Sequence, residues 1–205
     1  MKPRLLDLFC GAGGSGVGYA RAGFEVVGVD ISPQPRYPFE FHQADAMTFP
    51  LGGFDVIHAS PPCQSYSSAM KHLAKPQPKL VEPLRERFSG KLYVIENTPG
   101  CPLIKPTVLC GTSFGLRIWR HRLFECPIKL KSLKCFHNGR PINPHRQDGR
   151  DRIKSEFGRR NPEIVWRDAA GLGWMTKKHE WREAIPPVYT KYLGEQLLEF
   201  LYSTG

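Results

Sequence analysis

Residues 4–30 of this chain read RLLDLFCGAGGSGVGYARAGFEVVGVD, and this stretch decides the fold. An apolar run at 4–9 predicts a buried strand, and the glycine-rich loop after it opens a helix at about 14–22. A second apolar run at 25–29 ends at Asp30. This order of strand, glycine loop, helix, strand and acidic residue is typical of the nucleotide-binding half of a doubly wound α/β sheet.

The glycine loop suits a bound nucleotide. Glycines let the backbone come close to a ligand, and they leave the amides of the following helix pointing at it. A carboxylate at the end of the second strand, here Asp30, can accept hydrogen bonds from the two hydroxyls of a ribose. We therefore expect a nucleotide-derived cofactor at this end of the sheet.

Later segments continue the alternation of strands and helices. Apolar runs at 54–59 and 92–95 predict two more buried strands, with a short helix at about 80–88 between them. Residues 33–43 are too rich in proline for a helix and are expected to cross to the next strand as extended chain. An apolar stripe predicts a helix at 188–202. The fold class is therefore α/β, a doubly wound and mostly parallel sheet.

The loop after the run at 54–59 reads SPPCQSYS, residues 60–67, and presents Cys63. Two prolines before the cysteine fix φ and stiffen its approach, and small or hydroxylated residues follow it. Because open α/β sheets bind their ligands at the carboxyl ends of the strands, this thiol is placed for chemistry. The alternative is that Cys63 is a small buried hydrophobe, the commoner role of a lone cysteine.

Three motifs, in their order and spacing, resemble those of the cytosine carbon-5 methyltransferase family. They read DLFCGAGG at 7–14, PCQ at 62–64 and ENTPG at 96–100. The resemblance implies a Rossmann-like enzyme that uses S-adenosylmethionine to methylate carbon 5 of cytosine in DNA. It also implies a covalent adduct between Cys63 and a flipped-out base, since the ring is unreachable inside a duplex. The likeness spans residues 2–125 and, more loosely, the C-terminal helix.

The resemblance assigns roles to individual residues. Cys63 would be the nucleophile, Glu96 would donate to ring nitrogen 3 with a raised pKa, and Arg120 and Arg122 would hold the target nucleotide and its phosphate. The residues expected to contact S-adenosylmethionine are Phe9, Cys10, Gly11, Ala12, Gly13, Gly14, Asp30, Ile31, Asp45, Ala46 and Pro61. In the family, an aspartate at the position of Asp45 would contact the adenine amine.

Structural alternatives stand beside these roles. Asp45 could cap a turn, Glu96 could be an ordinary polar residue at a strand end, and the two arginines could lie on a solvated strand face. An imperfect alternation from Ile118 onward predicts that this face belongs to a strand, with both arginines pointing the same way. The family's C-terminal helix completes the cofactor pocket through a Gly-Asn pair, which reads Gly194-Glu195 here.

Positive charge gathers in one segment. The net charge is +10, and residues 117–167 hold 14 basic and 5 acidic side chains, so nearly all the excess lies there. Residues 126–167 match the position of the family's target-recognition region, although they are fewer than usual, and form a small basic insert. Residues 1–125 and 168–205 then make the catalytic and cofactor-binding domain. The residues expected to contact nucleic acid are Gln64, Ser67, Lys129, Lys131, Arg146, Arg150 and Arg152.

Other classes of function remain open. The pattern Gly11-x-Gly13-x-x-Gly16 with Asp30 downstream also matches a nicotinamide-dinucleotide fingerprint, although the later motifs have no place in a dehydrogenase. Some relatives with the same motifs act on transfer RNA, so RNA is an alternative substrate. A DNA-binding protein that keeps the fold without turnover is a third alternative, and so is a basic surface without any partner.

The six cysteines bear on compartment. They lack the dense spacing of a secreted disulfide scaffold, and no apolar run approaches the length of a membrane span. The first strand also begins too close to Met1 for a signal peptide. We expect a soluble cytoplasmic protein, located in a host cell if virus-encoded, with DNA as its partner, no membrane association and no obligate protein partner.

Four residues in and near the basic segment have zinc-ligand side chains. They are Cys126, Cys135, His137 and His145. Their spacing is irregular, and no Cys-x-x-Cys pair exists in the sequence. The sequence therefore favours no metal at these four residues, and a zinc site stays open as the alternative.

Overall fold

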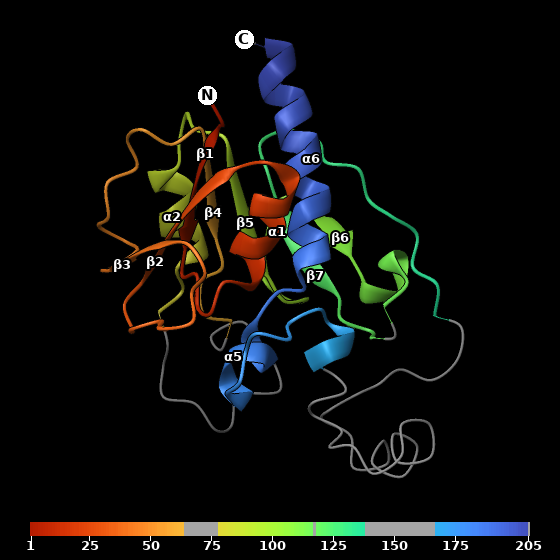
Figure 1. Cartoon of the computed structure of the whole chain (residues 1–205). Coiled ribbons are helices and arrows are strands. Elements are labelled where there is room, and N and C mark those ends of the chain that lie inside the picture. The colour runs from red at the N-terminus through yellow and green to blue at the C-terminus, as the bar shows by residue number, and fades with distance from the viewer. Residues whose placement is uncertain (64–77, 117, 138–166, 205) are drawn as a thin grey trace.

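The computed structural model describes residues 1–63, 78–116, 118–137 and 167–204, and contains one seven-stranded sheet in the order β3-β2-β1-β4-β5-β7-β6 (Figure 1). The strands are β1 (Arg4–Leu8), β2 (Glu25–Asp30), β3 (Glu40–Gln43), β4 (Val56–Ala59), β5 (Tyr93–Asn97), β6 (Thr107–Leu109) and β7 (Arg122–Glu125). All pairings from β3 to β5 are parallel, whereas β7 is antiparallel to both β5 and β6. The predicted doubly wound, mostly parallel sheet is confirmed.

Helices cover both faces of the sheet. They are α1 (Gly14–Ala22), α2 (Val81–Arg87), the 3-10 helix η2 (Gly111–Phe114), α5 (Lys178–Glu183) and α6 (Pro187–Thr204). Helices α1 and α6 pack side by side on one face, and α2 lies on the other. None of the helices in the described ranges combines the length and apolar character that a bilayer crossing requires.

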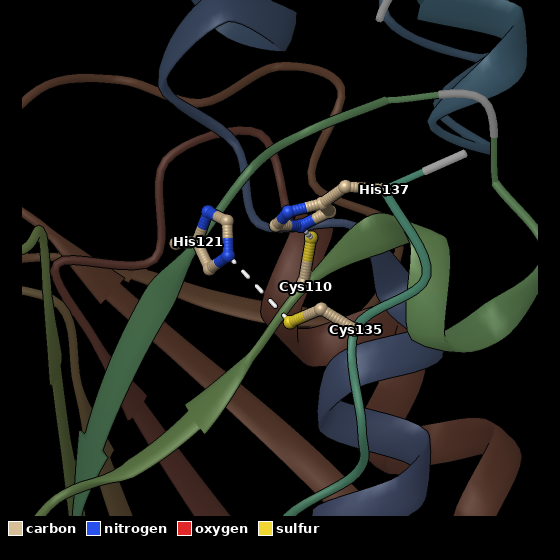
Figure 2. Close-up of side chains that lie close together, drawn as sticks. All are labelled: Cys110, His121, Cys135 and His137. Atoms are coloured by element: carbon tan, nitrogen blue, oxygen red, sulfur yellow. Dashed lines mark hydrogen bonds between the residues drawn. The ribbon is translucent and has the colours of Figure 1, made fainter. Parts of the chain in front are cut away.

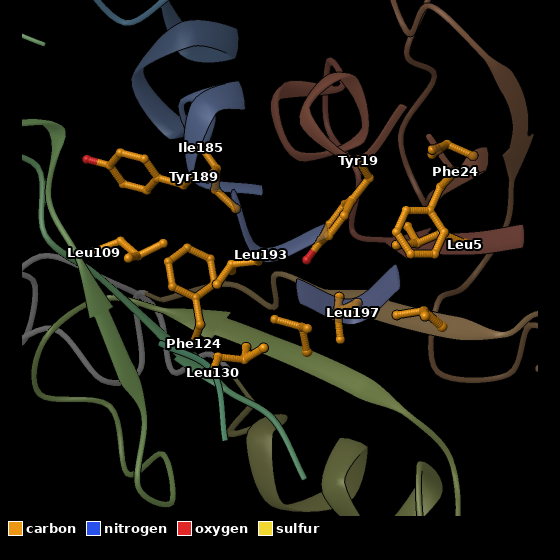
Figure 3. Close-up of a cluster of buried hydrophobic side chains, with 13 residues drawn as sticks. Leu5, Tyr19, Phe24, Leu109, Phe124, Leu130, Ile185, Tyr189, Leu193 and Leu197 are labelled. Atoms are coloured by element: carbon orange, nitrogen blue, oxygen red, sulfur yellow. The ribbon is translucent and has the colours of Figure 1, made fainter. Parts of the chain in front are cut away.

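Alternate side chains of β1 pack in two different apolar cores, because successive side chains of a strand point to opposite faces of the sheet. Leu5 packs with Tyr19 of α1 and Tyr189 of α6 in the cluster drawn in Figure 3. Leu6 and Leu8 pack in a second cluster against the residues of α2. A strand buried on both faces explains why residues 4–9 read as a continuous apolar run.

The contact between α1 and α6 depends on a missing side chain. A Cβ atom placed on Gly18 would lie 1.9 Å from the hydroxyl oxygen of Thr190, so only glycine permits this approach. The Thr190 hydroxyl donates to the carbonyl oxygen of Ser15 at 2.8 Å. Through these contacts α6 is fixed against the helix that follows the glycine loop.

Two boundaries differ from the predictions. The strand expected from Ile118 begins only at Arg122, and the short strand β6 lies in a stretch where no strand was expected. Residues 33–43 are extended at their end, as expected, but residues 40–43 themselves form β3, the edge strand paired with β2.

Candidate active site

The glycine loop turns sharply at the carboxyl end of β1. Phe9, Gly11 and Gly13 all have positive φ, of 57°, 49° and 88°, a conformation that costs a non-glycine residue such as Phe9 free energy. The amide of Gly11 donates to Oδ2 of Asp30 at 3.0 Å, which ties the loop to the end of β2. A Cβ atom on Gly11 would meet nothing within 4 Å, so the space over this glycine is open.

A buried carboxylate, Asp7, supports this loop from below. It accepts hydrogen bonds from the hydroxyls of Ser15 at 2.9 Å and Tyr37 at 3.2 Å. Burial raises the pKa of Asp7 to about 7, although these two hydrogen bonds act in the opposite direction. Tyr37 also covers Gly28, whose Cβ atom would lie 2.3 Å from the tyrosine ring. The structure therefore gives Asp7 a supporting role inside the sheet.

The predicted cofactor residues lie along one edge of the sheet. They follow the carboxyl ends of four neighbouring parallel strands, with 9–14 after β1, 30–31 after β2, 45–46 after β3 and Pro61 after β4. Ile31 is 72 % exposed although it is apolar, which leaves its side chain available to a ligand at this edge.

Asp45 behaves as the structural alternative predicts. Its Oδ1 accepts a hydrogen bond from the amide of Met47 at 2.8 Å and so caps the turn after β3. The residue is exposed at the same edge as Asp30. Its expected contact with adenine therefore stays a prediction.

Cys63 and Glu96 lie at the same edge of the sheet. The strands β4 and β5 are parallel neighbours with Ala59 opposite Ile95, so the loop to Cys63 begins at the edge where Glu96 lies near the carboxyl end of β5. The side-chain amide of Asn97 donates to the carbonyl oxygen of Pro61 at 3.0 Å and ties the two ends together. Cys63 is half-buried with a free thiol.

The carboxyl group of Glu96 is almost completely buried, with the residue only 6 % exposed. Burial raises its pKa, while the charges of Arg122 and Arg120 and a hydrogen bond from Ser60 act in the opposite direction. Nε of Arg122 lies 2.9 Å from Oε1 of Glu96, but without hydrogen-bond geometry, so within the described ranges this oxygen accepts no hydrogen bond. A buried carboxyl oxygen in this state is suited to a polar ligand atom.

Behind Glu96, a buried histidine continues the polar network. Nε2 of His58 lies 2.8 Å from the Ser60 hydroxyl, and Nδ1 lies 3.0 Å from the hydroxyl of Tyr19. Burial lowers the pKa of His58 to about 3, so the ring is neutral at physiological pH. A neutral ring can donate a hydrogen bond from one nitrogen and accept one at the other. His58 therefore orients the Ser60 hydroxyl, which in turn donates to Glu96.

Acidification should therefore destabilise the protein through His58. In the unfolded chain the ring binds a proton near pH 6.5, whereas the folded ring resists protonation until about pH 3, so stability falls as pH decreases through this window. Between pH 7.5 and 4.5 we expect the free energy of unfolding of the wild type to lose about 2–3 kcal/mol relative to His58→Gln, which does not titrate. Urea unfolding at both pH values measures this difference, and equal losses would show that His58 is protonated in the fold.

The two arginines of the predicted pair have different partners. Arg122 lies against Glu96, whereas Nη2 of Arg120 donates to the carbonyl oxygens of Arg182 at 2.8 Å and Ala184 at 2.9 Å. These carbonyls lie at the end of α5, where a guanidinium compensates for the missing helical donors. The prediction that both residues share one strand face is therefore wrong, because Arg120 lies ahead of β7 and faces α5.

The C-terminal segment meets the glycine loop at Ile185, ahead of the Gly194-Glu195 pair that stands in place of the family's Gly-Asn. A Cβ atom on Gly14 would lie 2.5 Å from the carbonyl oxygen of Ile185, just before α6. Gly194 instead packs against Ala22 at the far end of α1, and exposed Glu195 pairs with Lys191. Nine helical residues span about 13 Å, so Gly194 and Glu195 lie away from the glycine loop.

A third apolar cluster packs residues from the C-terminal part of the chain against the glycine loop. It joins Ala12 to Ile118 and to Leu172, Met175 and Trp181. The indole nitrogen of Trp174 donates to the carbonyl oxygen of Ala12 at 3.1 Å. Residues 167–185 therefore close over the predicted cofactor loop.

The predicted nucleic-acid contacts are mostly outside the described residues. This holds for Gln64, Ser67, Arg146, Arg150 and Arg152, and for most of the basic segment. Lys129 and Lys131 are described and exposed, but they follow β7 at the opposite edge of the sheet from Glu96. The amide of Lys131 donates to Gln196 at 2.6 Å, in the part of α6 remote from the glycine loop.

Sequence reasoning missed three residues that support the site through hydrogen bonds. Asn97 lies inside the ENTPG motif but was given no role, and His58 and Tyr37 have no motif signal beyond their positions near predicted strands. Each works through a partner that is distant in the chain, Pro61, Tyr19 and Asp7 respectively. A polar residue inside an otherwise apolar strand, as at His58, is the one hint that the sequence offers.

Comparisons with known proteins agree with this architecture. The fold is that of S-adenosylmethionine-dependent methyltransferases. The sequence model of the family described as C-5 cytosine-specific DNA methylase matches residues 3–81, which contain the glycine loop and Cys63. Over this part of the chain the match agrees with the resemblance seen in the motifs.

Solved structures with this fold span nearly the whole chain. A prophage-encoded protein of E. coli, described as a DNA modification methyltransferase, aligns with a TM-score of 0.61 at 16% identity, covering 98% of this chain and 100% of that one. The methyltransferase EhMeth of Entamoeba histolytica gives 0.59 at 12% identity, with 98% and 99% covered. Dnmt2 of S. pombe gives 0.59 at 13%, with the same coverage. No curated protein sequence matches the chain.

Proposed function

We propose that this protein transfers a methyl group from S-adenosylmethionine to carbon 5 of cytosine in DNA, through a covalent adduct of Cys63 with a flipped base. One observation carries the proposal. The thiol-bearing loop follows β4, and the buried Glu96 lies near the carboxyl end of its parallel neighbour β5, at the edge where the glycine loop also lies; Asn97 ties the two together through Pro61. A nucleophile, an acid and a cofactor loop at one edge match the needs of this reaction.

The residues at the glycine loop fit S-adenosylmethionine. The open space over Gly11, the carboxylate of Asp30 beside it and the exposed apolar Ile31 suit a ribose and an adenine ring. When bound, S-adenosylmethionine supplies an electrophilic methyl group on a sulfonium. Asp30 would hold the ribose hydroxyls, and residues 9–14 would direct the rest of the donor toward Cys63.

Cys63 and Glu96 would act at two different atoms of the cytosine ring. Carbon 5 of cytosine is a poor nucleophile, so the thiolate of Cys63 first adds to carbon 6 while Glu96 donates to nitrogen 3. Electron density moves to carbon 5, which would take the methyl group from the donor; the bond between that methyl group and the donor sulfur breaks, and its electron pair stays on the sulfur of the departing thioether. A base then removes the carbon-5 proton, and the bond between carbon 6 and the sulfur of Cys63 breaks.

Arg122 would position Glu96 for this step. Its guanidinium lies against Oε1 in a site closed to solvent, so the carboxyl group is held in one orientation. We infer that the remaining donors of Arg122 contact the target nucleotide. Arg120 donates to the carbonyls at the end of α5 and its charge also acts on Glu96, so it would connect that helix to the site.

The test uses the whole chain with labelled methyl donor and three separate substrates: duplex DNA, single-stranded DNA and transfer RNA. Mass spectrometry of the digested nucleosides should find 5-methyldeoxycytidine and no 5-methylcytidine. Label on transfer RNA alone would replace the proposal by RNA methylation. Donor binding without transfer to any of them would indicate a binding protein. Calorimetry with NADH as the control ligand tests the dinucleotide alternative.

A further inference from the structure

Four metal-ligand side chains from three separate segments meet beside the candidate active site. They are Cys110 at the end of β6, His121 just before β7, and Cys135 and His137 in the segment that follows β7 (Figure 2). One ligand atom from each residue lies within 4.8 Å of every other. This grouping differs from the four residues considered from the sequence: it adds Cys110 and His121 and omits Cys126, which packs against the first apolar core, while His145 lies outside the described residues.

The printed distances fit a tetrahedral metal site. With bonds of about 2.3 Å to sulfur and about 2.0–2.1 Å to nitrogen, a tetrahedral zinc ion places a sulfur and a nitrogen ligand about 3.6 Å apart. Sγ of Cys110 lies 3.5 Å from Nε2 of His137, and Sγ of Cys135 lies 3.6 Å from Nε2 of His121. The two imidazole rings are nearly perpendicular, at 86°, with their centroids 5.1 Å apart.

Neighbouring groups hold these side chains in place. The Thr112 hydroxyl lies 3.3 Å from Sγ of Cys110 and accepts a hydrogen bond from the amide of Phe136 at 3.2 Å. Trp119 stacks on His137 with ring centroids 4.7 Å apart. Such outer contacts orient metal ligands in known sites.

We propose that Cys110, His121, Cys135 and His137 bind one zinc ion. Thiolates and imidazoles are typical ligands of zinc, whereas magnesium and calcium prefer oxygen ligands. Four protein ligands close the coordination shell, so the ion is structural and leaves no position for a substrate. Binding converts both thiols to thiolates and releases their two protons to solvent.

The position of the ion gives it a function. His121 stands between Arg120 and Arg122, so the ion fixes the stretch that carries Glu96's partner and the arginine that binds the end of α5. Cys135 and His137 bring the chain back from the far edge of the sheet to the candidate active site. The zinc ion therefore anchors the start of the basic segment beside the catalytic residues.

The first measurement is the metal content of the whole chain, purified under reductant and without chelator. Elemental analysis should find about one zinc per chain. Replacement by Co²⁺ should give the visible absorption of tetrahedral thiolate coordination. His137→Ala is the leading variant because His137 is the exposed member of the four ligands. Since loss of an outer partner alone weakens metal sites by about 10–100-fold, loss of this ligand should weaken zinc by at least that much.

Cys126→Ser is the matched control, because Cys126 is half-buried outside the cluster. It should keep one zinc per chain, while Cys135→Ser should lose it. Wild-type protein that stays zinc-free after incubation with zinc chloride would overturn the proposal. A disulfide between Cys110 and Cys135 under these conditions, or His137→Ala with unchanged affinity and Co²⁺ spectrum, would also overturn it. These readouts do not depend on methyl transfer, so the two proposals fail separately.

Discussion

Replacing Cys63 by alanine is expected to abolish methyl transfer and to leave the affinity for S-adenosylmethionine unchanged. Without the thiolate, carbon 5 receives no electron density, so the rate should fall by at least about 10³-fold. The cofactor residues, by contrast, follow β1, β2 and β3, and share only Pro61 with the cysteine loop. Loss of a half-buried side chain at this position therefore leaves the donor site in place.

Two measurements check this expectation. Rates of methyl incorporation compare Cys63→Ala with wild type and with Cys126→Ala, a cysteine variant at the opposite edge of the sheet. Calorimetry gives the donor Kd of each protein. DNA containing 5-fluorocytosine should form a complex stable to denaturation with wild type, because fluorine at carbon 5 blocks the final elimination, and should form none with the alanine variant. Unchanged turnover in Cys63→Ala would exclude the covalent mechanism.

The first half of the fold was predictable because its signals are local. Helix α1 begins at Gly14 and ends at Ala22 as expected, and β2 ends at Asp30. Strands buried on both faces leave continuous apolar runs, and the glycine loop between them has few conformations compatible with its sequence. The same locality placed Cys63 and Glu96 at strand ends, and therefore at one edge of the sheet.

The second half could not be predicted because its contacts are distant in sequence. Arg120 donates to the carbonyls of residues 182–184, more than sixty residues later, and residues 118–121 lie outside β7. The proposed zinc ligands show the same limit. Cys110 and His121 are too far from Cys135 in the sequence to form a recognisable metal-binding motif. The antiparallel pairing of β6 with β7 places them near each other, and the chain after β7 brings Cys135 to them.

Replacing Glu96 by glutamine should lower the rate of methyl transfer by about 10²–10³-fold, with little change in the affinity for nucleic acid. Glutamine keeps the shape of the side chain and can accept the hydrogen bond from Ser60. Its amide can also donate a hydrogen bond to nitrogen 3, but it cannot transfer a proton to it. The substitution therefore removes stabilisation that develops as the thiolate adds to the ring, and it leaves ground-state contacts nearly intact.

The pH dependence of the rate separates this role from a structural one. Burial raises the pKa of Glu96, and the protonated form is the one that can donate to the ring, so the contribution of Glu96 should fall as pH rises through that pKa. Glutamine does not titrate, so the rate of Glu96→Gln should not show this decrease with rising pH. Single-turnover rates measured across pH, together with the Kd for duplex DNA, test both points. If rate and affinity fell by the same factor, with the profile unchanged, Glu96 would serve to hold Arg122 and the site would lack its acid.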